Sequence, residues 1–250
     1  MKNVTLILLV WGGSYIGLMA QEPGKPEKAY KNTVRFNLTN PLIFGTKSIV
    51  FGYERVLTKR SSFSVNIGQA SFPDFEIIDA DSLRANSILG ESGFHISGDY
   101  RFYLSKENKF EAPRGVYIGP YFAYNYFERK NSWKLTSTNG GSPQTAETKT
   151  SLSIASLGFE FGYQFIFWKR LSLDLILLGP GIAGYNLKAS VGSNLSEEDR
   201  QKLFDRLNEG LADKFPGYST VIDEGDFKKT GTAKTTTFGF RYMIMIGFRF

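Results

Sequence analysis

The sequence has no cysteine and only one histidine among its 250 residues. Without cysteine, it can form no disulfide, thiolate metal site, cysteine nucleophile or lipoprotein anchor. A single histidine is also too few for the ligand sets that transition metals prefer. We therefore expect neither a metal site nor another cofactor.

Long apolar runs are missing as well. The mean hydropathy is −0.21 and 42% of the residues are hydrophobic, which excludes a bundle of transmembrane helices. The nearest approach to an apolar span outside the N-terminal region is Leu171 to Leu187. It is interrupted by Asp174, Pro180 and three glycines.

The first twenty residues resemble a cleaved export signal. Lys2 provides a positive start, Val4 to Val10 form a short apolar core, and the small Ala20 precedes polar Gln21. This pattern predicts a signal peptide over residues 1–20 and delivery to the periplasm of a Gram-negative bacterium. Residues 21–32 are then expected to be a mobile periplasmic leader before a single domain over residues 33–250.

Aromatic residues and glycine are abundant instead. The chain has 22 Phe, 13 Tyr and 26 Gly, the composition expected of a transmembrane β-barrel with aromatic girdles and curved strands. The net charge of +6 comes from scattered basic residues. It favours contact with outer-membrane lipid and lipopolysaccharide, and argues against nucleic-acid binding.

The C-terminal segment alternates strictly between apolar and other residues, which is the period of a β-strand. Phe248 and the terminal Phe250 close this series and resemble the signal by which outer-membrane barrels are recognised for assembly. We therefore expect the barrel assembly machinery to be a partner during insertion. The alternating apolar positions are Phe238, Phe240, Tyr242, Ile244, Ile246, Phe248 and Phe250.

The same alternation predicts seven further strands, with a bulge near Ser153 to Leu157 where the register is ambiguous. The fold class is thus all-β, an eight-stranded antiparallel transmembrane β-barrel in meander order. It must be closed, because an open edge in lipid would leave backbone groups unpaired. The seven strands are Thr33–Thr39, Ile49–Val56, Ser62–Ala70, Phe94–Leu104, Val116–Phe127, Leu157–Phe167 and Leu171–Leu187.

The predicted connections alternate between short and long. This asymmetry is typical of outer-membrane barrels and predicts an integral outer-membrane protein with periplasmic termini and short turns, and with long loops outside. The short connections are 58–61, 105–114 and 168–170, and the long ones are 41–48, 71–93, 128–149 and 188–234.

The inward positions of these strands carry charges of both signs. An eight-stranded barrel is only wide enough for side chains, and buried charges must be paired. We therefore expect a lumenal polar network that fills the barrel; the alternative is a proton or ion path, as in a narrow channel. The predicted network comprises Arg35, Glu54, His95, Asp99, Arg101, Glu160, Asp174, Arg241 and Arg249.

His95 and Ser97 share one face of a strand, as a base and a nucleophile on a strand would. This spacing resembles the H-x-S of outer-membrane lipid A deacylases, which are also eight-stranded barrels. Two departures argue against a catalytic pair: Gly98 stands where the deacylases have Asn, and His95 faces inward, whereas the deacylases act on the lipid-facing surface. We expect no enzyme activity, with a deacylase-like enzyme as the alternative.

The last long loop, 188–234, contains a helical pattern. Ser196 is placed to cap a helix whose first turn is acidic, and the pattern predicts a helix over residues 196–215. It would form a lid over the barrel mouth or dock a partner. Its apolar residues include Leu203, Phe204, Leu207 and Leu211.

Two pairs of segments resemble a family of small, uncharacterised eight-stranded outer-membrane β-barrel proteins of Bacteroidetes. They are Asn32–Pro41 with Phe51–Val56, and Tyr100–Leu104 with Gly115–Tyr121. The resemblance implies an outer-membrane location and no enzyme activity. We expect a structural element or an accessory subunit of a larger assembly, with other outer-membrane proteins as partners.

Overall fold

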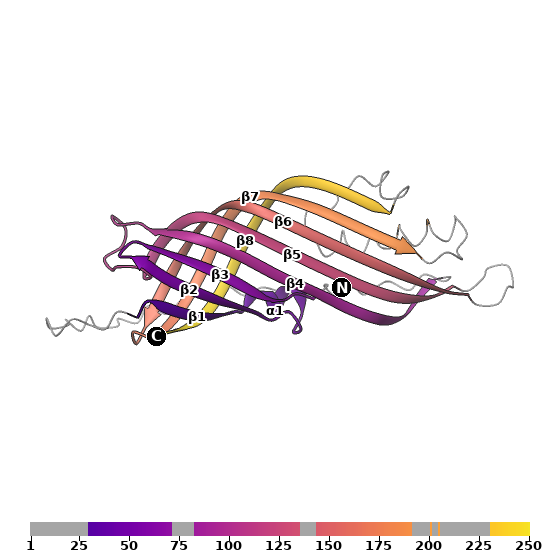
Figure 1. The fold of residues 1–250 in the computed structure, drawn as a ribbon, viewed down its shortest axis with the longest axis horizontal. Helices are drawn as coiled ribbons and strands as arrows, with labels where there is room; N and C mark the ends of the chain where they lie inside the picture. Colours follow the sequence, from indigo (N-terminus) through magenta and orange to yellow (C-terminus); the bar gives the residue numbers. More distant parts are fainter. Residues whose placement is uncertain (1–29, 72–82, 136–143, 192–200, 202–204, 206–230) are drawn as a thin grey trace, which may run out of the picture.

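The computed structural model describes residues 30–71, 83–135, 144–191, 201, 205 and 231–250. These residues form one closed barrel of eight antiparallel strands in sequence order (Figure 1). The fold predicted from the alternation is thereby confirmed. The elements are β1 (Asn32–Asn37), α1 (Thr39–Phe44), β2 (Val50–Thr58), β3 (Ser61–Gln69), β4 (Leu83–Tyr103), β5 (Gly115–Leu135), β6 (Gln144–Phe167), β7 (Leu171–Val191) and β8 (Thr232–Arg249).

The pairing of β1 with β8 closes the barrel. Val34 lies opposite Phe248 and Phe36 opposite Ile246. The ladder ends where Phe250 N donates to Asn32 O at 2.9 Å. Closure leaves no free edge along β1, so the backbone groups of this short strand are paired on both sides.

The two ends of the barrel differ. One end, called the turn end here, carries the short connections 59–60, 104–114 and 168–170 together with Asn32 and Phe250. The opposite end is called the loop end. Towards it, β4 to β8 extend well past β1 to β3 (Figure 1).

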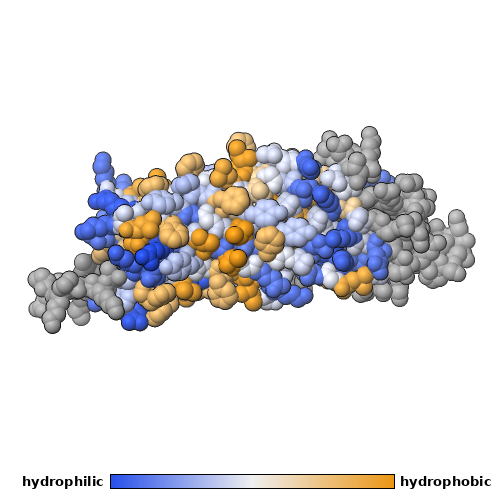
Figure 2. Space-filling view, in the orientation of Figure 1, coloured by the Kyte–Doolittle hydropathy of each residue, from blue (hydrophilic) through white to orange (hydrophobic). Residues whose placement is uncertain are grey.

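The outer surface carries a belt of exposed apolar side chains, while the residues between them face the lumen. On β6, for example, Leu157 and Phe159 are exposed, whereas Glu160 is buried. Figure 2 shows this apolar band flanked at both ends by hydrophilic residues. Its members include Val34, Phe51, Val65, Ile96, Phe122, Leu157, Phe159, Ile182, Phe240 and Ile246.

Several strands are longer than their hydropathy predicts. The predicted loops 71–93 and 128–149 contain long strand segments, because β4 starts at Leu83, β5 runs to Leu135 and β6 starts at Gln144. In these extensions polar residues pair with one another, as Asn131 does with Thr148. The hydropathy alternation therefore fades although backbone pairing continues. Lys188 and Lys234, the bounds of the last predicted loop, also lie within strands.

The predicted bulge in β6 is wrong. Even-numbered residues of β6 face the lumen without a break, and buried Leu152 is an apolar member of that inward set, which caused the ambiguity. The irregularity lies in β7 instead. Leu177 and Leu178 are both exposed, and the register of β7 shifts there against both β6 and β8.

The helix α1 occupies part of the segment that was expected to be a loop. Asn37 Oδ1 accepts hydrogen bonds from the backbone N–H groups of Thr39 (2.8 Å) and Asn40 (3.1 Å), which satisfies donors at the helix start. Pro41 is tolerated in the first turn, where its missing N–H has no partner to lose. The ring of Phe44 then packs 5.6 Å from that of inward-facing Phe127.

Among the described residues, none of the helices is long and apolar enough to span a membrane.

The β6–β7 turn generates a first prediction. Trp168 and Lys169 adopt φ values of 46° and 67°, as in a type I′ turn, which favours Asn-Gly. A non-glycine residue in this region costs about 1–2 kcal/mol, part of which is offset because glycine loses more entropy on folding. Lys169→Gly should therefore stabilise the barrel by about 1 kcal/mol, measured as a higher urea midpoint in detergent.

The matched control is Lys59→Gly, the same substitution in the β2–β3 turn. Lys59 is not among the described residues with positive φ, so its glycine variant should gain nothing. An equal gain in both variants would show that backbone strain at Lys169 is not the cause.

Candidate functional site in the lumen

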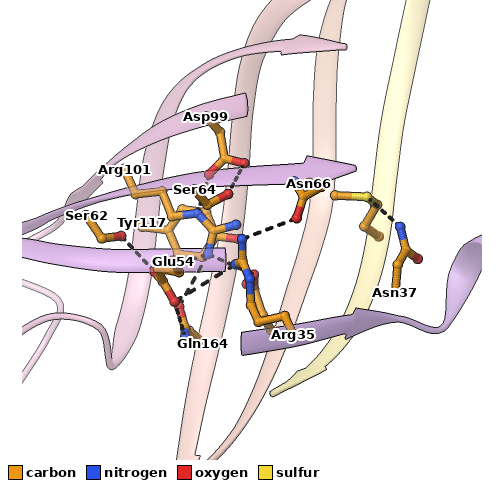
Figure 3. A network of polar contacts seen from close by, with 12 residues as sticks. Arg35, Asn37, Glu54, Ser62, Ser64, Asn66, Asp99, Arg101, Tyr117 and Gln164 are labelled. Carbon is orange, nitrogen blue, oxygen red and sulfur yellow. Dashed lines mark hydrogen bonds and ion pairs between the residues drawn. The ribbon is translucent and has the colours of Figure 1, made fainter. Parts of the chain in front are cut away.

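Arg101, on β4, lies at the centre of the lumen and is completely buried. Its Nε donates to Asp99 Oδ1 at 2.6 Å and its Nη1 donates to Asp174 Oδ2 at 2.7 Å. The guanidinium also lies 4.4 Å from the ring centroid of Tyr117. One arginine thus joins acids from β4 and β7 and covers an aromatic face, which compensates the cost of removing its charge from water. Figure 3 shows Arg101 with Asp99 and Tyr117 in this network.

Arg35, on β1, reaches the same carboxylate from the opposite side of the barrel. Its Nη1 donates to Asp174 Oδ2 at 2.8 Å, and Tyr117 Oη donates to Asp174 Oδ1 at 2.7 Å. The Asp174 carboxylate therefore accepts hydrogen bonds from two guanidinium groups and one hydroxyl group. This carboxylate ties β1, β4, β5 and β7 together across the lumen.

Glu54, on β2, is held mainly by neutral groups. Ser62 Oγ donates to its Oε1 at 2.7 Å and Gln164 Nε2 donates to its Oε2 at 2.8 Å. Tyr103 Oη adds a third donor at 3.1 Å. Arg101 and Arg35 lie farther away, at 3.6 and 3.9 Å. Hydrogen bonds from neutral donors stabilise a charged carboxylate without a closely paired cation.

Arg241, on β8, forms the part of the network nearer the loop end. Its Nη1 donates to Glu160 Oε2 at 3.0 Å, and its guanidinium lies 4.9 Å from the ring centroid of Tyr121. Asp99 Oδ2 is 3.8 Å from Arg241 Nη2 and accepts a hydrogen bond from Ser64 Oγ at 2.6 Å. Asp99 therefore links the Arg101 and Arg241 groups.

One residue of the predicted network, Arg249, lies apart from the other charges. Arg249 lies at the turn end, where it donates to the backbone oxygens of Lys169 (3.2 Å) and Tyr30 (2.7 Å). It shares the inward parity of β8 but lies close to the end of that strand, too far from the central layer. The central layer thus has four carboxyl groups and three guanidinium groups, which explains why Glu54 needs its neutral donors.

A second, apolar layer lies towards the loop end. Phe127, Leu152, Leu187 and Ala233 face inward in one row, each directly opposite the next across β5 to β8. All four are buried, and Phe44 of α1 packs on Phe127. An ion moving along the lumen would meet this apolar layer as well as the charged one.

His95 lies between the two layers, in contact with Ser97 and Asn125. Its Nε2 is 3.0 Å from Ser97 Oγ, and its Nδ1 is 2.7 Å from Asn125 Oδ1. This order of hydroxyl, imidazole and amide has the form of a nucleophile, a base and an orienting group. However, Ser97 Oγ also accepts hydrogen bonds from Asn66 (3.1 Å) and Arg241 (3.4 Å), and both His95 and Ser97 are buried in the lumen.

Some predicted residues lie apart from the lumen or outside the described residues. Phe248 and Phe250 are exposed on the outer face at the turn end. Within the predicted helix 196–215, the structure describes only Gln201 and Asp205, which are helical; Leu203, Phe204, Leu207 and Leu211 lie outside the described residues. The signal peptide over residues 1–20 also lies outside them and stays a prediction.

Four further residues of the lumen are not in the predicted network. Ser62, Ser64 and Tyr103 donate to the acids, and Asn125 contacts His95. All four have the inward parity of their strands, which was the available signal. Among the described residues, no group of three or more histidine or acidic side chains is arranged to hold a metal ion.

The network generates a second prediction. Arg101→Leu removes the main cation of Asp99 and one of the two on Asp174, and should cost about 3–5 kcal/mol of unfolding free energy, as breaking a buried pair does. The measurement is the denaturant midpoint in detergent, followed by the gel shift between folded and unfolded barrel. Arg55→Leu, at an exposed outward position, is the control and should change the midpoint little.

A double variant separates lost pairing from lost packing. Adding Asp99→Asn to Arg101→Leu removes a buried charge that has lost its nearest cation, so the double variant should be more stable than the single one. The opposite result is a double variant that is less stable than Arg101→Leu by as much as Asp99→Asn destabilises the unmodified barrel. In that case the two side chains are not coupled.

No protein-family model matches this sequence, and no curated protein shows significant similarity to it. Among solved structures, the chain is similar to a major outer membrane protein from Thermus thermophilus. The identity is 11% and the TM-score 0.35, over 88% of this chain and 98% of that chain. It is likewise similar to CarO2 from Acinetobacter baumannii, with 10% identity and a TM-score of 0.35 over 88% of this chain and 96% of that one. Structural similarity this low carries no argument about function. The assignment of a closed barrel comes from the strand pairing of this chain itself.

Proposed function

We propose that this chain is a non-enzymatic β-barrel of the bacterial outer membrane, serving as a structural element or as an accessory subunit of a larger outer-membrane assembly. The observation that carries the proposal is the belt of exposed apolar side chains around a filled, ion-paired lumen. In water such a belt would drive aggregation. In a bilayer it is the surface that faces lipid.

The placement of the connections supports an orientation. In outer-membrane barrels, short turns lie in the periplasm and long loops lie outside. The turn end is therefore proposed to be periplasmic, with Asn32 and Phe250, and the loop end extracellular. We also infer kinship with the small barrels of Bacteroidetes that the sequence resembles.

The accessory role is favoured by the shape of the loop end. There β4 to β8 continue past β1 to β3 as a wall of paired strands (Figure 1). This wall would present a stiff surface outside the membrane to neighbouring outer-membrane proteins. A channel is disfavoured, because the central layer of charges and the apolar row around Phe127 fill the lumen one above the other.

The test of this proposal is reconstitution. Refolded barrel should insert into lipid vesicles, with the mobility shift typical of a folded barrel, and should give no discrete conductance steps in a planar bilayer. The parallel experiment is isolation from native membranes in mild detergent, which should retrieve the barrel together with other outer-membrane proteins. Conductance steps would favour a channel, and failure to insert would contradict the membrane location.

The contact between His95 and Ser97 makes a lipid A deacylase-like enzyme the second candidate. We expect His95→Ala and Ser97→Ala to leave the acyl chains of host lipid A unchanged, since both side chains are buried on the lumenal side and an acyl chain in the membrane would lie outside the wall. Mass spectrometry of lipid A from cells with each variant is the measurement. If cells with the unmodified protein show an altered acyl-chain pattern in lipid A, and each variant abolishes that alteration, the protein is an enzyme.

A further inference from the structure

The outer wall of β5 to β8 changes its chemistry in steps towards the loop end. The strand register places outward residues in rows across these four strands. The apolar row Phe122, Leu157, Ile182 and Phe238 is followed by Tyr124, Ala155, Gly184 and Thr236, and then by Tyr126, Ser153, Asn186 and Lys234. Successive rows are about 7 Å apart along the strands, so apolar, small and polar side chains follow one another within about 14 Å.

The row of small side chains makes a hollow in this wall. Ala155 and Gly184 lie between the larger Tyr124 and Thr236, and the hollow above them has a volume of about 560 Å³. Asn186 and Lys234 line its side nearer the loop end. The hollow therefore opens to the outside of the barrel, directly beyond the apolar belt.

The wall beyond the hollow is basic. Lys188 lies diagonal to Lys234 across β7 and β8, a spacing of about 7–8 Å, and neither forms an ion pair with a described carboxylate. Lys130 and Lys149 are directly opposite each other on β5 and β6, although like charges in that position repel. Among the described residues, this part of the wall also carries two acids, Glu128, which is 3.1 Å from Lys149, and the exposed Glu147 on β6.

We propose that this hollow binds the phosphorylated sugar headgroup of an outer-leaflet glycolipid, an inference that rests on the membrane location proposed above. The acyl chains would lie on the row of Phe122 and Leu157, and the sugar would fill the space above Gly184. A phosphate group would lie between Lys188 and Lys234. Each part of the ligand meets the row whose chemistry matches it.

The test is titration of the refolded barrel in neutral detergent micelles with bis-phosphorylated lipid A, read by native mass spectrometry. The double variant Lys188→Gln with Lys234→Gln should bind at least about tenfold more weakly, because it loses two charge-assisted contacts. Dephosphorylated lipid A should bind the unmodified barrel with a similar loss. The charge-matched control, Lys106→Gln with Lys109→Gln at the turn end, should bind like the unmodified barrel.

A second variant tests the hollow without changing charge. A side-chain carbon on Gly184 would meet Ala155 O and Thr236 Oγ1 at 3.9 Å, which is ordinary contact, so Gly184→Val should fold. It should also reduce binding about tenfold by occupying the space of the sugar.

Three results would overturn the proposal. In the first, the turn-end control weakens lipid A binding as much as the Lys188 and Lys234 double variant does. In the second, the unmodified barrel binds phosphatidylglycerol as tightly as lipid A. In the third, both the lysine variant and the Gly184 variant bind lipid A like the unmodified barrel. Since the titration is done in micelles, it is independent of whether the barrel inserts into vesicles. Failure of the proposed location and failure of this site are therefore distinguishable.

Discussion

The hydrogen-bonded pairing of β1 with β8 is the constraint on which the rest of the structure depends. Because the ring is closed, every strand has a neighbour on both sides near the turn end, and each side chain there points either into the lumen or out of the barrel. A ring of eight strands encloses only enough space for side chains. Any charge on an inward position must therefore find its partner inside this space, and Arg101, Arg35 and Asp174 meet there from strands far apart in the sequence.

The same closure explains how the lumen tolerates an excess of acid. With Arg249 drawn to carbonyl oxygens at the turn end, three arginines face four carboxyl groups. Neutral donors then become essential, and Ser62, Gln164 and Tyr103 surround Glu54 with hydrogen bonds. The apolar row at Phe127 adds a layer that needs no partners. The charged layer and the apolar layer therefore fill the lumen one above the other.

The bulge at Leu177 and Leu178 connects the inner and outer surfaces. Before it, the odd-numbered residues of β7 face outward; after it, the even-numbered residues do. Without this extra residue, Gly184, Asn186 and Lys188 would face the lumen and Tyr185 would face outward. One irregularity in one strand thus decides which side chains line the hollow in the wall. Bulges that redirect side chains are often found beside functional sites for this reason.

The sequence by itself determined the fold class, the order of the eight strands, the short turns and the inward position of the seven charges in the central layer, since alternation with a period of two is a local pattern. Only the tertiary structure decided the length of β4 to β8, because pairing continues where both faces are polar. It also decided where the bulge lies and which groups Arg249 contacts. The partners were equally inaccessible from the sequence: His95 meets Asn125, and Arg101 meets Asp174, through a register that exists only once the ring has closed. Hydropathy encodes which way a side chain points, but not which side chain it will face.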